Sequence, residues 1–250
     1  MIRLSANLGF LWKDRALPDA IRAAKAAGFD AVECHWPYDI PAEEVRQALE
    51  ETGLPMLGLN TRRGREGENG LSALPGRESE ARAAIDEAFD YGAEIGASAV
   101  HVMAGASRGV EGAAQSFQEN LAYAADLGGK YGMTVLIEPL NARDAPSYFH
   151  QTVEEAAAIL ETLGRTEVRI MFDCYHQQIM GGDLLRRFER HRDRIGHVQF
   201  AAVPSRAEPD EGEVAFDRLL PMLDWPGPIG AEYRPRASTE AGLGWMNAFR

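Results

Sequence analysis

The sequence predicts an α/β protein, a (β/α)8 TIM barrel formed by a single domain over residues 1–250. Short β-type runs alternate with helical stretches along the whole chain, which is typical of a parallel sheet. The length of 250 residues suits one such barrel. An open doubly wound sheet usually carries a GxGxxG turn after an early strand. This sequence has no such turn after its early predicted strands, so a closed barrel is favoured over an open sheet.

Eight segments have the length and apolar composition expected of strands. They are residues 3–8, 31–35, 56–60, 99–103, 134–138, 169–173, 196–200 and 229–233. The segments between them place apolar residues three or four positions apart, as at Ile85, Ala88 and Phe89, which indicates helices. Four glycines are predicted to end helices: Gly28, Gly53, Gly96 and Gly132.

Two long polar segments, 61–76 and 201–213, each follow a predicted strand. In a barrel the loops after strands lie on the catalytic face, so we expect both near the active site. Either loop is a candidate lid.

The charge and cysteine content exclude several classes of protein. The formal net charge is −12 and the only lysines are Lys13, Lys25 and Lys130, so no nucleic-acid partner is expected. No run of 18 apolar residues predicts a membrane span, and the N-terminus is interpreted as a first strand, not a signal peptide. Cys34 and Cys174 form no disulfide framework. The cytoplasm is the expected compartment. Both a monomer and a homo-oligomer are compatible with the sequence.

Polar side chains gather where the last four predicted strands end. Glu138, Asp173, Gln199 and Glu232 are each about one βα repeat apart. A barrel would bring all four to one rim, on neighbouring strands. A single acid at a strand end is more often a helix cap or a loop hydrogen-bond partner, whereas a set of four favours a functional site.

Three converging carboxylates would repel one another unless a positive charge lay among them. A divalent metal ion supplies that charge. Mainly oxygen ligands favour Mg²⁺ or Mn²⁺, because zinc prefers histidine and cysteine. The sequence therefore predicts a magnesium or manganese site.

Four motifs on these strands carry a resemblance to a known family. They are IEPLNARD at 137–144, FDCYHQQIMGGDL at 172–184, GHVQFAAVPSRAEPDEGEV at 196–214 and AEYRPRASTEAGLGW at 231–245. They resemble the hydroxypyruvate isomerases of the xylose-isomerase-like barrel superfamily, and the resemblance covers essentially the whole chain. The segment 61–69 looks shorter than in that family, and it helps to shape the pocket.

The resemblance implies roles for individual positions. The four strand-end residues above match the metal ligands, and Glu138 and Glu232 also match the pair of glutamates that transfer the proton. His176 matches a substrate-binding histidine, and Arg206 matches an arginine of the loop after the seventh strand. His101, at the end of the fourth predicted strand, is either a further substrate ligand or a core residue.

The expected reaction interconverts hydroxypyruvate and 2-hydroxy-3-oxopropanoate (tartronate semialdehyde) through an enediolate, with a small 2-oxo acid or ketose as substrate. A 2-oxotetronate isomerase and a ketose isomerase or epimerase of the same superfamily are alternatives. A metal-independent glycoside hydrolase would also use two carboxylates, but it would leave Asp173 and Gln199 without a role.

Three other polar residues also lie near the predicted strand ends. His35 follows the second strand, and a packing role is favoured. His197 points into the barrel one layer below Gln199, as a hydrogen-bonded core group. Glu208 is either an ion-pair partner of Arg206 or a solvated loop charge.

Overall fold

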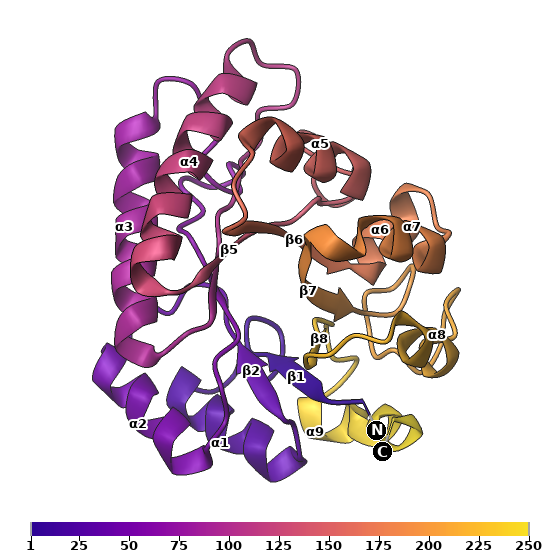
Figure 1. Cartoon of the computed structure of the whole chain (residues 1–250). Helices are drawn as coiled ribbons and strands as arrows, with labels where there is room; N and C mark the ends of the chain where they lie inside the picture. The colour runs from indigo at the N-terminus through magenta and orange to yellow at the C-terminus, as the bar shows by residue number, and fades with distance from the viewer. Residues whose placement is uncertain (1, 250) are drawn as a thin grey trace.

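The computed structural model describes residues 2–249 and confirms the (β/α)8 barrel (Figure 1). All strand pairs are parallel, in the order β2-β1-β8-β7-β6-β5-β4-β3. The strands are β1 Leu4–Asn7, β2 Ala31–Glu33, β3 Leu59–Asn60, β4 Ala99–His101, β5 Thr134–Ile137, β6 Val168–Asp173, β7 Ile195–Phe200 and β8 Ile229–Ala231.

Hydrogen bonds between β2 and the segment before β3 close the barrel. Val32 forms an isolated parallel bridge with Met56, and the Cys34 N–H donates to the Gly58 carbonyl. The predicted strand 56–60 therefore pairs with β2 along its length, although only Leu59–Asn60 belongs to the regular ladder.

The helices form an outer layer around the strands (Figure 1). They are α1 Leu17–Ala27, α2 Ala42–Thr52, α3 Glu78–Ile95, α4 Ala113–Tyr131, α5 Val153–Leu163, α6 Cys174–Met180, α7 Leu184–His191, α8 Phe216–Leu223 and α9 Thr239–Gly242, with 3-10 turns at Arg192–Arg194 and Leu243–Ala248. The four glycines predicted to end helices are confirmed at the ends of α1 to α4, each with a left-handed backbone. Two helices, not one, follow β6. Among the described helices none has the length and hydropathy that a bilayer crossing needs.

Side-chain alternation along the strands divides the barrel interior into layers. Ala99, Leu136 and Met171 form a small apolar cluster inside the barrel, separate from the main core between strands and helices. Two residues further along β5 and β6, the same face carries Glu138 and Asp173. An apolar floor thus lies directly below the polar residues at the rim.

Candidate active site

The four predicted strand-end residues lie together at the carboxyl-terminal rim of the barrel. Asp173 ends β6 and pairs in register with Gln199 of β7, while Glu138 and Glu232 immediately follow β5 and β8. All four side chains are buried, with between 1% and 6% of their surface exposed. The fold therefore removes three carboxylates and one amide from water at a single place.

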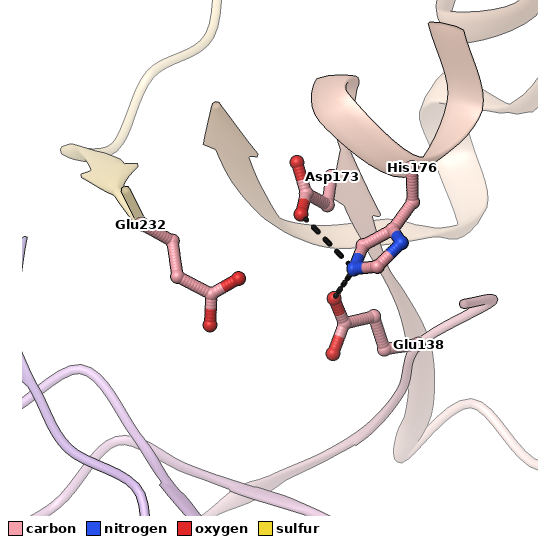
Figure 2. A group of neighbouring side chains, drawn as sticks. All are labelled: Glu138, Asp173, His176 and Glu232. Carbon is pink, nitrogen blue, oxygen red and sulfur yellow. Dashed lines mark ion pairs between the residues drawn. The ribbon is translucent and has the colours of Figure 1, made fainter. Parts of the chain in front are cut away.

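His176 joins this group from the first turns of α6. Asp173 caps that helix by accepting a hydrogen bond from the Tyr175 N–H, so the chain turns sharply and brings His176 over the rim. Potential ligand atoms of Glu138, Asp173, His176 and Glu232 lie within 4.8 Å of one another. Figure 2 shows the Glu232 carboxylate extending toward the other three side chains.

Several oxygens of this group have no hydrogen-bond partner within residues 2–249. They are Glu138 Oε1, Asp173 Oδ2 and Gln199 Oε1, and all are buried. Burial and the charge of Glu232 raise the pKa of Asp173 to about 7, and the same two causes raise the pKa of Glu138 well above its ordinary value. A cation among these oxygens would satisfy both the lone pairs and the negative charge, so the residues fit a bound divalent metal.

Glu232 differs from the other two acids because both of its oxygens already accept hydrogen bonds. Asn7 Nδ2 donates to Oε1 over 3.0 Å, and His35 Nε2 lies 3.1 Å from the same oxygen. Arg206 Nη2 donates to Oε2. Burial alone would raise the pKa of Glu232, but the guanidinium charge and the His35 hydrogen bond lower it to about 2.

Arg206 is the guanidinium that faces the acid cluster. Its Nη2 lies 3.9 Å from Asp173 Oδ2, and its planar group lies between the rings of Phe10 and Tyr175, 4.8 and 4.9 Å from their centroids. The buried Nε atom of Arg206 has no partner in the described chain. One donor of the guanidinium is thus left for an anion.

Hydrogen bonds fix the tautomer of His176. The Arg143 and Asp144 N–H groups donate to Asn141 Oδ1, so the Asn141 Nδ2 group must face His176 Nδ1, 2.7 Å away. The Asn141 N–H also donates to this Nδ1, over 2.9 Å. Since Nδ1 accepts and burial lowers the pKa of His176 to about 3, the neutral ring carries its proton on Nε2.

This tautomer decides which of the clustered groups could hold a metal. His176 Nε2 lies 3.5 Å from Asp173 Oδ2 and 3.7 Å from Glu138 Oε1, facing both as an N–H donor (Figure 2). A protonated nitrogen has no lone pair for a cation. The oxygens of Glu138, Asp173, Gln199 and Glu232 do have lone pairs, so the set suited to a metal excludes His176.

His101 lies at the end of β4, beside this cluster. Its Nδ1 is 3.7 Å from Glu138 Oε2, and neither ring nitrogen has a hydrogen-bond partner among the described residues. Burial lowers its pKa to about 4, so the ring is neutral. His101 is therefore available to bind a substrate oxygen or the glutamate.

The structure revises the expectations for two neighbouring residues. His35 packs against Phe10 and Trp36, as the sequence favours, and its Nε2 also lies 3.1 Å from Glu232 Oε1. A Cβ at Gly9 would lie 2.1 Å from the His35 ring, so only glycine admits the ring there. Glu208 neither pairs with Arg206 nor lies in solvent. It is buried and accepts hydrogen bonds from the Arg236 backbone N–H and Nε, which ties the loop 201–213 to the segment after β8.

A cavity of about 350 Å³ opens above the cluster. Both long loops predicted to lie near the site contribute to its wall, 61–76 through Arg63 and 201–213 through Arg206.

Three residues of the site were not predicted from the sequence: Asn7, Glu33 and Asn141. The first two end β1 and β2, a position that could have identified them.

The sequence matches the family described as "Xylose isomerase-like TIM barrel" over residues 21–249. It is 42% identical to the 2-oxo-tetronate isomerase of Cupriavidus necator, over 100% of this chain and 99% of that protein. It is 34% identical to the hydroxypyruvate isomerase of Escherichia coli, over 100% of both chains. A crystal structure of an AP endonuclease of family 2 from Brucella melitensis superposes with a TM-score of 0.96 at 37% identity, covering 100% of both chains.

The chain therefore belongs to the xylose isomerase-like TIM barrel family. Within it, the chain is an enzyme of the isomerase group that contains the hydroxypyruvate and 2-oxo-tetronate isomerases. The resemblance stated from the strand-end motifs is confirmed.

The raised pKa values of Glu138 and Asp173 predict how pH affects stabilisation by a metal. Without metal, the folded protein binds these protons more tightly than the unfolded chain, so stability falls as pH rises from about 4 toward 7. A metal ion that binds to these carboxylates would have to displace the same protons. Saturating Mn²⁺ should thus raise the Tm by about 3 °C more at pH 7.5 than at pH 5, measured by thermal unfolding. Equal shifts at both pH values would contradict this, and Asp173→Asn should lose most of the shift.

Proposed function

We propose that this protein is a divalent-metal-dependent isomerase that moves a carbonyl between C2 and C3 of a short 2-oxo acid through an enediolate. Hydroxypyruvate is the proposed substrate and 2-hydroxy-3-oxopropanoate the product. The observation that carries the proposal is the set of unpartnered, buried oxygens on Glu138, Asp173 and Gln199 beside Glu232. The pairing of β1 with β8 supports one domain for the whole chain.

The proposed ligands of the metal are Glu138, Asp173, Gln199 and Glu232, and oxygen ligands of this kind suit Mg²⁺ or Mn²⁺. A cation bound there would supply Lewis-acid stabilisation of the negative charge that develops on substrate oxygens. The amide of Gln199 adds an oxygen without adding a further charge to the three carboxylates.

Glu138 and Glu232 are proposed to carry the proton. One carboxylate removes it from C3 and a carboxyl group returns it to C2. Their environments differ: Arg206 and His35 lower the pKa of Glu232, whereas in the metal-free chain burial beside Glu232 and Asp173 raises the pKa of Glu138. A cation bound among these carboxylates would lower the pKa of Glu138 as well, so either glutamate could remove the proton.

Arg206, His176 and His101 are proposed to bind the substrate. The unpartnered Nε of Arg206 provides a donor for the substrate carboxylate. The Nε2–H of His176 points at the cluster and could donate to a substrate oxygen. Each of these groups lines the cavity above the carboxylates.

The cavity supports a small substrate. About 350 Å³ is at the lower end of the range for small-molecule pockets, which suits a short acid better than a polysaccharide. A second candidate substrate is a 2-oxotetronate, because a relative that is 42% identical is named for that activity. The four-carbon acid would use the same metal and the same two glutamates.

Turnover of hydroxypyruvate tests the proposal directly. Metal-free protein should be inactive, and Mg²⁺ or Mn²⁺ should restore formation of 2-hydroxy-3-oxopropanoate. Product formation is measured in an assay that couples 2-hydroxy-3-oxopropanoate to a reductase. Glu138→Gln and Glu232→Gln should each lower kcat by about 10²- to 10⁴-fold, the usual contribution of a proton-transferring group. A 2-oxotetronate assayed in parallel compares kcat/KM for the two acids.

The matched control is Glu87→Gln, an acid that pairs with Arg62 on the protein surface and should keep full activity. Activity that persists in EDTA would point to the metal-independent alternative. If neither acid turns over with either metal, the proposed substrate class is wrong.

Arg206→Lys tests recognition of the carboxylate. Lysine keeps the charge but loses the planar fork, so we expect KM to rise about 10- to 100-fold, the value of a hydrogen bond to a charged group. Steady-state kinetics with hydroxypyruvate measures this, and Arg62→Lys on the surface is the control. An unchanged KM would show that Arg206 does not bind the substrate.

A further inference from the structure

Gln199 is the one neutral member of the proposed ligand set, and only one end of its amide can bind a cation. The carbonyl oxygen has lone pairs, whereas the NH₂ group would present hydrogens to the metal. The two ends are nearly equal in size, so sterics alone does not select the orientation. Some other group must decide which end faces the carboxylates.

Glu33 contacts the amide of Gln199 inside the barrel. Its side chain extends from the end of β2 and is only 3% exposed. Glu33 Oε2 accepts a hydrogen bond from Gln199 Nε2 over 3.3 Å and lies 2.6 Å from His197 Nε2. Because Nε2 carries both hydrogens of the amide and donates to Glu33 Oε2, the NH₂ group of Gln199 faces Glu33. The Oε1 atom of Gln199, which is buried and unpartnered in the described chain, then points away from Glu33.

This contact spans the barrel. Strands β1 and β8 lie between β2 and β7 in the sheet, so Glu33 reaches across two strands to meet Gln199. Gly230 of β8 lies under the contact, and a Cβ there would come within 2.1 Å of Glu33 Oε1 and 2.8 Å of Gln199 Cγ. A glycine in the strand between them is what lets the two side chains meet.

We propose that Glu33 is a positioning residue that holds the amide of Gln199 with its oxygen toward the metal, and that His197 in turn holds Glu33. This rests on the proposed function only in requiring a metal at the cluster; it makes no use of the substrate. It also gives the expected core histidine a role, since His197 Nε2 is hydrogen-bonded to Glu33 Oε2 over 2.6 Å. Glu33 and His197 thus form a layer of supporting contacts behind the proposed metal ligands.

Replacing Glu33 tests the proposal through metal affinity. In Glu33→Gln the new side chain can offer either an oxygen or an NH₂ group, so it no longer excludes the reversed amide of Gln199. We expect the Kd for Mn²⁺, measured on the metal-free full chain by equilibrium dialysis and by the free-Mn²⁺ EPR signal, to rise about 10- to 100-fold. Unfolding curves in EDTA confirm that the variant is folded.

A double-mutant cycle separates orientation from charge. In Gln199→Ala the amide is absent, so nothing remains to orient. Adding Glu33→Gln in that background should change the Mn²⁺ Kd by no more than about threefold, because the two positions are proposed to be coupled only through the amide. Glu33→Asp, which keeps the charge but is too short to reach Gln199, should weaken binding only when Gln199 is present.

Each outcome decides the matter. A large loss confined to the Gln199 background supports the positioning role. An equal loss in both backgrounds shows that Glu33 acts by its charge alone and overturns it, as does an unchanged Kd in Glu33→Gln and Glu33→Asp. A wild-type chain that binds no Mn²⁺ would refute the metal site of the proposed function as well. Tight Mn²⁺ binding without turnover of any 2-oxo acid would leave this inference standing and reject only the substrate.

Discussion

The burial of three carboxylates at one point of the barrel rim is the constraint on which the rest of the site depends. Glu138, Asp173 and Glu232 are all at least 94% buried, and their potential ligand atoms lie within 4.8 Å of one another. Like charges this close destabilise the folded chain unless a cation or protons neutralise them. Arg206 neutralises part of the charge at Glu232, and the oxygens that Arg206 does not satisfy are those suited to a metal.

Around these acids, hydrogen-bond direction decides what each neutral side chain can do. Asn141 accepts from backbone N–H groups and so fixes His176 with its proton on Nε2. Glu33 accepts from the amide of Gln199 and leaves the oxygen free. Asn141 thus makes His176 a donor that faces the carboxylates, and Glu33 makes Gln199 a further acceptor beside them. Together they favour a cation held by oxygen and a substrate held by N–H groups.

Strand periodicity made much of this predictable. The spacing of Glu138, Asp173 and Glu232 at successive strand ends depends only on the βα repeat, which is visible in the residues. The neutral donors were not predictable in the same way, because Asn141 lies in a loop and its partner lies on a helix after the next strand. The contact of His35 with Glu232 was not predictable either, because it depends on the approach of Gly9, a property of the folded backbone.

The metal is proposed to bind the oxygens of the four strand-end residues while His176 stays a hydrogen-bond donor. Pulsed EPR of the Mn²⁺-loaded protein measures whether a nitrogen is directly coordinated to the ion. We expect no directly coupled imidazole nitrogen, and an unchanged Mn²⁺ spectrum in Asn141→Ala. A strong coupling to a histidine nitrogen, lost in His176→Ala, would contradict it.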